Sequence, residues 1–312
     1  MATRVIITGA TGFIGRALCR ALRGDYELIA LSRDAVRAAE ILGEDAKAVE
    51  WDARTASSWA RHIEGAHAII NLAGEDVGRG RWTQPKRDSI MQSRTNSANA
   101  VVDAVAGARN KPAVVIQASA VGYYGSRGDE LLDEYSSPGN GFLAEVDRKT
   151  ESIIAKVDRS GVRYVATRSG LVLGREGGAL PRLLAPFRFY IGGYAGNGRQ
   201  WVSWISLPDE IRAIRFLMDN PSLKGAFNLT SPNPVTMKQF ARTLGRVLHS
   251  PAWTVLPGFA ARLVFGQMAD EVLLTSQKVI PRRLLEAGFS FRDPDLPAAL
   301  DAIFRGENHE PV

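Results

Sequence analysis

Three glycines, Gly9, Gly12 and Gly15, follow a short apolar run in the segment VIITGATGFIGRAL. This spacing suits a strand-to-helix turn that binds a pyrophosphate. The first glycine permits the tight turn, the second lets the backbone approach the ligand, and the third lets the helix pack closely on the strand. The helix N-terminus offers unpaired N–H groups and a positive dipole to the phosphates. We therefore expect a dinucleotide site here, lined also by the intervening residues Thr11, Phe13 and Ile14.

The next apolar run ends in Ser32 and Arg33, where a dinucleotide-binding protein recognises the adenosine ribose. An acidic residue there binds a 2′-hydroxyl, whereas an arginine accommodates a 2′-phosphate. A hydroxyl beside a guanidinium therefore favours NADP(H) over NAD(H). Asp34 follows, but as the N-cap of the next helix it would point away from the ribose. The alternative is that Arg33 is a surface charge.

The residues at the ends of the next two apolar runs fit the same dinucleotide ligand. Asp52, followed by Ala53, could accept a hydrogen bond from the adenine amino group. The segment Asn71, Leu72, Ala73 and Gly74 would let the backbone pass close to the nicotinamide-side ribose. In order, at the ends of successive strands, these segments mark the crevice where open α/β sheets bind ligands.

Short β-branched runs alternate with helical patterns through the first half of the chain, which predicts a parallel sheet with crossover helices. Strands are expected at 4–9, 27–32, 46–52, 67–74, 113–119 and 163–170, and helices at 12–24, 34–43, 93–107 and 142–161. The fold class is α/β, a Rossmann-type doubly wound parallel sheet with a smaller C-terminal substrate-side region. We assign residues 1–170 to the NADP(H)-binding domain, with 200–232 returning to it, and 171–199 and 233–312 to the substrate-side region and C-terminal module.

Composition narrows the class of protein. The 312 residues are 45% hydrophobic and 23% charged, and no apolar run reaches the roughly 18 residues of a membrane span. One cysteine and four histidines without paired spacing give no disulfide framework and no metal site. The net charge is +6, which could indicate nucleic-acid binding, but acidic residues interleave with basic ones along most of the chain, so we expect a solvated, arginine-rich surface. A cytoplasmic protein follows, with a small-molecule substrate, no nucleic-acid or membrane partner, and a homodimer allowed.

The glycine spacing, Asp52, NLAG and QASAVGYYG together resemble the extended short-chain dehydrogenase/reductases of the NAD-dependent epimerase/dehydratase superfamily. More narrowly, RWTQPKRDSIMQSR, TRSGLVLGREGGAL, GNGRQWVSWI and VLLTSQKVIPRRLLEAGFSFRDPDL are similar to a poorly characterised atypical branch that ends in a module of unknown function. The resemblance covers nearly the whole chain. It implies a Rossmann-type sheet and a serine beside the nicotinamide, which is Ser119 here.

The chain departs from that family at its acid/base pair. Ordinary extended members carry Tyr-x-x-x-Lys on the helix after the fifth strand, and the lysine lowers the pKa of the tyrosine. Aligned on Glu151, these places hold Leu143 and Asp147. Tyr123 and Tyr124, just after Ser119, are the nearest replacements, although paired aromatic residues in such loops often pack instead.

Basic and aromatic residues supply candidate substrate contacts. Arg79, Arg81, Lys86, Arg87 and Arg94 cluster around Trp82. Guanidinium groups bind carboxylates and phosphates bidentately, so these residues are expected to bind an anionic substrate or the cofactor's own pyrophosphate. Arg94 and Arg168 stand in motifs of the branch, and we place Arg94 beside the cofactor. The substrate-binding prediction comprises Arg81, Trp82, Arg168, Gln200 and Trp204.

Two functions remain open on the sequence. The first is an NADP(H)-dependent oxidoreductase or epimerase on a small anionic or sugar-nucleotide-like substrate, with Ser119 and Tyr123 or Tyr124 near the reacting oxygen. The second is an inactive NADP(H)-binding sensor or interaction protein, which the missing Tyr-Lys pair favours.

Overall fold

A seven-stranded parallel sheet forms the centre of the molecule, with strands in the order β12–β7–β5–β4–β1–β2–β3. The structure is a computed structural model that describes residues 3–56, 59–78 and 80–306. The strands are β1 (Thr3–Thr8), β2 (Tyr26–Ser32), β3 (Lys47–Glu50), β4 (Ala66–Asn71), β5 (Val114–Ala120), β7 (Arg163–Ser169) and β12 (Gly225–Leu229). The predicted Rossmann-type fold is confirmed.

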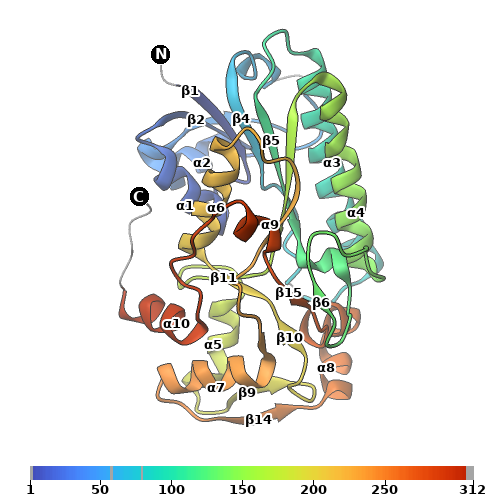
Figure 1. Cartoon of the computed structure of the whole chain (residues 1–312), viewed down its shortest axis with the longest axis vertical. Coiled ribbons are helices and arrows are strands. Elements are labelled where there is room, and N and C mark those ends of the chain that lie inside the picture. The colour runs from blue at the N-terminus through green and yellow to red at the C-terminus, as the bar shows by residue number, and fades with distance from the viewer. Residues whose placement is uncertain (1–2, 57–58, 79, 307–312) are drawn as a thin grey trace.

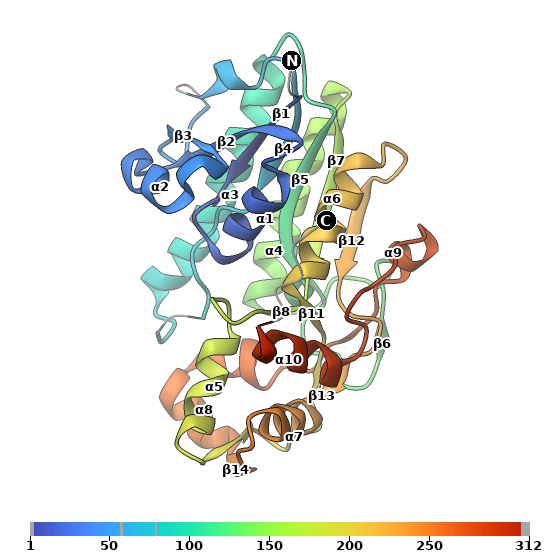
Figure 2. The same ribbon diagram turned by 90° about the vertical axis from the view of Figure 1, so that its left-hand side faces the viewer.

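The strands read as continuous apolar runs because both faces of the sheet are covered. In β1, Val5 and Ile7 pack into the hydrophobic core on one face and Ile6 packs into the core on the other. Helices α1 (Phe13–Leu22), α2 (Ala35–Leu42) and α6 (Leu207–Asp219) lie on the first face; α3 (Gln84–Gly107) and α4 (Phe142–Ile154) lie on the second (Figure 1; Figure 2). All strand ends that face the cofactor crevice therefore meet at one edge of the sheet.

Two of the four predicted helices differ from their predicted bounds by more than two residues. Helix α3 begins at Gln84, nine residues before the prediction, because Thr83 caps it through the backbone N–H of Lys86 and Pro85 occupies its first turn. Lys86 and Arg87 are therefore helical. Helix α4 ends at Ile154 and continues as a 3₁₀ helix over Ala155–Ser160. The predicted caps of α2 are confirmed: Asp34 accepts from Arg37 N–H, and Gly43 ends the helix with a φ of 54°.

The remaining elements gather at the end of the molecule away from the N-terminus (Figure 1). Three two-stranded pairs hold this region together: β11 (Trp204–Ser206) with β8 (Leu171–Leu173), β10 (Trp201–Val202) with β13 (Val235–Thr236), and β14 (Ala252–Leu256) with β9 (Gly192–Ala195). Its helices are α5 (Leu180–Arg188), α7 (Met237–Val247), α8 (Gly258–Phe265) and α10 (Leu296–Arg305). A fourth pair, β15 (Lys278–Val279) with β6 (Leu131–Leu132), and the short α9 (Arg282–Glu286) return the chain to the sheet side.

No helix in the described part of the chain is both long and apolar enough to cross a bilayer.

Candidate functional site

The glycine turn between β1 and α1 is packed so closely that side chains are excluded. Gly9 has a φ of +65°, and a Cβ atom there would lie 2.8 Å from the carbonyl carbon of Leu72. A Cβ at Gly15 would overlap the Gly9 carbonyl oxygen. Gly12 is the N-cap of α1 and has no side chain to bond the first-turn N–H groups, and that turn contains no acidic residue. The turn therefore fits a pyrophosphate at its free N–H groups.

At the adenosine end, Ser32 and Arg33 leave the sheet at the end of β2. The Ser32 hydroxyl bonds the backbone of Asp34, whose carboxylate caps α2, so that carboxylate is turned to its own helix. Arg33 is exposed and has no hydrogen bond or ion pair with another described residue. Its guanidinium is thus available to a 2′-phosphate.

Asp52 forms a turn with its own loop. Its carboxylate accepts from the backbone N–H groups of Arg54 and Thr55 and from the Thr55 hydroxyl, each at 2.8 Å. This turn places Ala53 at a φ of +60°, a conformation that a non-glycine residue rarely adopts. Asp52 is exposed, and a carboxylate can accept more than these three bonds. The adenine contact of Asp52 and Ala53 stays a prediction.

The end of β4 is fixed by a buried polar cluster. Asn71 accepts from the Thr8 hydroxyl at 2.5 Å and donates to Gln117 at 2.7 Å, so its side chain serves the sheet and only its backbone can reach a cofactor. Beyond it, Leu72 and Ala73 pack against the glycine turn. Arg94 lies against Gly74 and donates to the Glu75 carbonyl oxygen at 3.1 Å. Burial lowers the pKa of Arg94, and Asp147 and Glu75 oppose that shift.

Strands β5, β7 and β12 present one polar residue each at the same level, Ser119, Arg168 and Asn228. Glu151 on α4 joins the first two: it accepts from Ser119 Oγ at 2.6 Å and from Arg168 Nε and Nη2 at 2.9 and 2.7 Å. Arg168 Nη1 donates to the Tyr124 hydroxyl at 3.0 Å. Although burial alone would lower it, the bonds to Glu151 raise the pKa of Arg168.

The structure separates the two tyrosines after Ser119. Tyr124 is fully buried, and its hydroxyl donates to Asn228 Oδ1 at 2.7 Å. Burial raises its pKa to about 12. A proton-transfer role for Tyr124 is therefore not supported. Tyr123 is half-buried under the Arg168 guanidinium, which lies 3.5 Å from its ring centroid, and its hydroxyl has no partner among the described residues.

Helix α4 carries Leu143 and Asp147 beneath the loop that contains Tyr123. Leu143 packs in an apolar cluster with Trp82 and Met268. Asp147 is buried, receives the Tyr123 backbone N–H, and has a second oxygen, Oδ2, without a hydrogen-bond partner. Burial raises its pKa to about 8, only partly opposed by the charge of Arg94. The place of the usual lysine thus holds a carboxyl group that keeps its proton near neutral pH.

The N-terminus of α4 is capped from far along the chain. Glu271, in the π-helical turn Ala269–Leu273, accepts from the backbone N–H groups of Phe142 and Leu143 at 2.7 and 3.0 Å. The C-terminal region therefore fixes the helix that flanks the expected nicotinamide position.

Three of the five predicted substrate residues are used by the fold itself. Trp204 is fully buried among Leu173, Leu180 and other apolar side chains, and its indole donates to the Asn233 carbonyl oxygen. The stacking surface predicted for Trp204 is absent, because the C-terminal helices cover it. Arg168 uses three of its five N–H groups, two on Glu151 and one on Tyr124, so the side of the guanidinium that carries Nε and Nη2 already binds a carboxylate. A further contact of Arg168 with a substrate stays a prediction. The Gln200 amide nitrogen donates to two backbone carbonyls.

The other two predicted substrate residues lie on the β4–α3 side of the crevice. Trp82 is buried, edge-on to Phe142 at 5.4 Å, and Arg81 is exposed and reaches the Leu263 carbonyl oxygen at 3.4 Å. A substrate role for both stays a prediction. Arg79 lies outside the described residues.

The sequence reasoning missed Glu151, Asn228 and Glu271. A signal existed for the first, since an arginine inside a buried strand needs a carboxylate partner. The other two act across more than 100 residues of chain, and no local pattern marks them. Among the described residues, no group of three or more His, Cys, Asp and Glu side chains could hold a metal ion.

Comparison with known proteins agrees with this architecture. An epimerase family protein of Mycobacterium leprae, ML0860, is 38% identical over 296 residues, which cover 95% of this chain and 94% of the relative. The crystal structure of human epimerase family protein SDR39U1 (isoform 2) with NADPH has a TM-score of 0.86 at 31% identity, over 98% of this chain and 100% of that chain. A Bacillus cereus UDP-glucuronic acid 4-epimerase, solved with UDP-glucuronic acid and NAD, shares the fold alone at 15% identity and a TM-score of 0.77, over 97% of this chain and 98% of its own.

Two family models match separate parts of the chain, one over the sheet region and one over the C-terminal region. Residues 256–303 match DUF1731, a domain of unknown function, as the resemblance of the C-terminal segment implied. Residues 5–230, which hold the sheet and its cofactor crevice, match the NAD dependent epimerase/dehydratase family. The expected family is thereby confirmed, and this chain belongs to the NAD dependent epimerase/dehydratase family.

Proposed function

We propose that this protein is an NADP(H)-dependent oxidoreductase or epimerase acting on a small anionic or sugar-nucleotide-like substrate. The observation that carries the proposal is a cofactor cradle suited to NADP(H): a glycine turn that excludes side chains, for the pyrophosphate, and the unpaired Arg33 at the end of β2, for the 2′-phosphate. The related human protein was crystallised with NADPH, which supports the same cofactor here. When bound, the nicotinamide supplies a hydride to the substrate or accepts one from it.

Ser119 and Tyr123 are the residues proposed to meet the reacting oxygen. The Ser119 proton is directed to Glu151, so its oxygen is left as an acceptor, which suits a substrate hydroxyl. The Tyr123 hydroxyl has no partner among the described residues and is available to donate, and the Arg168 guanidinium over the ring holds the ring in place. Arg168 and Glu151 position these two groups.

The first experiment separates cofactor binding from chemistry. Titration with NADPH and NADH should show tighter binding of NADPH. Arg33→Gln should remove that preference, whereas Arg109→Gln, an exposed arginine at the opposite edge of the sheet, should keep it. A panel of anionic alcohols, carbonyl compounds and sugar nucleotides is then followed at the nicotinamide absorbance band. Product stereochemistry is followed by NMR in parallel, because an epimerase regenerates its cofactor.

Turnover that falls in Tyr123→Phe while NADPH affinity is kept would support the proposal. The second candidate is a protein that binds NADP(H) and a second small molecule without converting it. Leu143 and Asp147 in place of Tyr and Lys favour this candidate. Its signature is NADPH-dependent binding of an anionic compound with no turnover across the panel. Failure to bind NADPH would exclude both functions.

A further inference from the structure

Acidic residues are missing from two long stretches of the chain, although they interleave with basic residues along most of it. Two runs, residues 177–208 and 220–269, contain no aspartate or glutamate. They contain eight basic residues: Arg182, Arg188, Arg199, Lys224, Lys238, Arg242, Arg246 and Arg262. Helices α5, α7 and α8 and strands β9 and β14 all come from these two runs, so these elements carry basic side chains and no acidic one. Arg182 and Arg262 form ion pairs with acidic residues outside the runs, Asp76 and Asp270.

Large apolar side chains are exposed on the same elements. Of the exposed large hydrophobic residues in the described chain, eight belong to these runs: Phe189, Tyr190, Ile191, Trp253, Val255, Phe259, Leu263 and Val264. Trp253, Phe259 and Leu263 are 75, 73 and 74% exposed. Phe259 and Leu263 stand four residues apart on α8 and therefore share one helix face. Clustered exposure of this kind marks a contact surface.

The exposed residues belong to neighbouring segments. Strands β14 and β9 pair in parallel, and the Trp253 indole donates to the Tyr190 carbonyl oxygen at 3.3 Å. Phe189, Tyr190 and Ile191 lead into β9, while α8 follows β14 directly. β14, β9 and α7 lie at the lower end of the long axis in Figure 1, where a flat surface can reach them.

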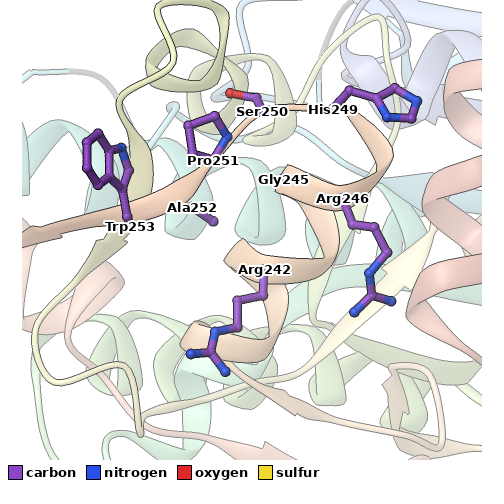
Figure 3. Close-up of a pocket in the computed structure, with 8 residues that line it drawn as sticks. All are labelled: Arg242, Gly245, Arg246, His249, Ser250, Pro251, Ala252 and Trp253. Atoms are coloured by element: carbon purple, nitrogen blue, oxygen red, sulfur yellow. The ribbon is translucent and has the colours of Figure 1, made fainter.

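An open depression of about 610 Å³ lies beside this apolar surface, lined by Arg242, Arg246, His249, Ser250 and Trp253 among others (Figure 3). Figure 3 shows both arginine side chains leaving α7 toward the same side. Neither guanidinium has an ion pair or hydrogen bond with another described residue. The depression therefore presents unpaired positive charge next to an exposed indole.

We infer that this end of the molecule, which we call the basic apolar face (residues 188–191, 242–253 and 255–264), binds the surface of an anionic phospholipid bilayer. Lipid phosphates would contact Arg242 and Arg246, and Trp253, Tyr190 and the α8 side chains would enter the interfacial region. Aromatic residues favour that region, and basic residues beside it are attracted to anionic headgroups. The expectation of no membrane partner rested on the missing membrane span, which does not exclude a surface contact.

Charge complementarity selects the bilayer over other occupants. In a two-fold dimer through this face, two copies of the same basic surface would face each other, and like charges oppose association. Proteins that bind single-stranded nucleic acid stack the bases on aromatic side chains. Half of the exposed large hydrophobic residues on this face are aliphatic instead: Ile191, Val255, Leu263 and Val264. Aliphatic and aromatic side chains together with unpaired arginines match an anionic lipid surface.

Vesicle flotation tests the inference on the full chain. Vesicles of phosphatidylcholine alone are compared with vesicles that also contain phosphatidylglycerol, at low and high salt. The protein should float with the anionic vesicles at low salt and dissociate as salt screens the charges. Arg242→Gln/Arg246→Gln should lower the partition coefficient by about fivefold per arginine and roughly thirtyfold together. Arg148→Gln/Arg159→Gln, which removes the same charge from exposed positions elsewhere, should change it far less.

Two further variants test the apolar part. Trp253→Ser should weaken flotation, whereas Val36→Ser, a residue 74% exposed on α2, should not. Bound vesicles should shift tryptophan emission to the blue in the wild type and not in Trp253→Phe. Circular dichroism and urea unfolding confirm that each variant is folded.

Absence of flotation with anionic vesicles at low salt would overturn the inference. Equal loss in the two double-arginine variants would overturn it too, because net charge would then be the cause. A change in sedimentation mass in Trp253→Ser, with no vesicle binding by the wild type, would assign the face to contacts between copies and would also overturn it.

Discussion

Replacing Glu151 by glutamine should strongly destabilise the fold, because the change leaves the Arg168 guanidinium buried without its counter-charge. The two side chains are only 13% and 5% exposed, and Glu151 accepts three hydrogen bonds, two of them from Arg168. Breaking a buried pair on one side costs about 3–5 kcal/mol. We expect a loss of that size in the free energy of unfolding, measured by urea denaturation with an unchanged m-value.

Two controls isolate the cause. Glu130→Gln breaks a more exposed pair with Arg127, with side chains 49% and 27% exposed, and should cost at most about 1 kcal/mol. Glu151→Leu/Arg168→Met removes both charges and should recover most of the loss, since apolar replacement of a buried pair is often neutral. A cost for Glu151→Gln no larger than that for Glu130→Gln would refute the reasoning, because the pair would then be solvated.

Three further outcomes are expected. Gly15→Ala should abolish NADPH binding, measured by titration, because its Cβ would overlap the Gly9 carbonyl oxygen and push α1 from the turn; unchanged affinity would contradict the described packing. Ser119→Ala should lower turnover and cost about 1.5–3 kcal/mol of unfolding free energy for one bond to a charged group; unchanged turnover in the folded variant would argue against a role for Ser119 at the reacting oxygen. The pKa of Asp147 is raised from 3.8 to about 8 by burial, so its contribution to stability is fully present below pH 3.8 and is lost as pH rises to about 8. Asp147→Asn should therefore flatten the fall in melting temperature over that window, and an unchanged pH profile would mean that the carboxyl is solvated.

The fold of the cofactor-binding half could be predicted because the sequence patterns that specify it are local. Strand periodicity, the glycine spacing and the cap at Asp34 each involve residues within a few positions of one another, and the structure has the strands close to the predicted bounds. The early start of α3 was also readable, since Thr83 and Pro85 form a recognisable helix start. It was missed because the arginines around them were interpreted as a loop.

The candidate catalytic site could be predicted only in part. Ser119 follows from its place at the end of a strand, but whether Tyr123 or Tyr124 is free depends on Asn228 and Arg168, which arrive from other strands. Trp204 looked like a pocket residue because its motif is rich in glycine and aromatic residues. Its burial depends on how the C-terminal helices pack, and no spacing within the motif reports that packing.

The cap that Glu271 places on α4 couples the C-terminal region to the cofactor crevice. The turn Ala269–Leu273 directly follows the segment that contains α8, so displacement of that segment would release the first turn of α4 and shift Leu143 beside Asp147. Such linkage is reciprocal: if binding of the basic apolar face to a bilayer changes the affinity for the cofactor, the cofactor must change the affinity for the bilayer by the same factor. The DUF1731 region, which contains Glu271, is on this view a structural part of the crevice as well as a separate surface.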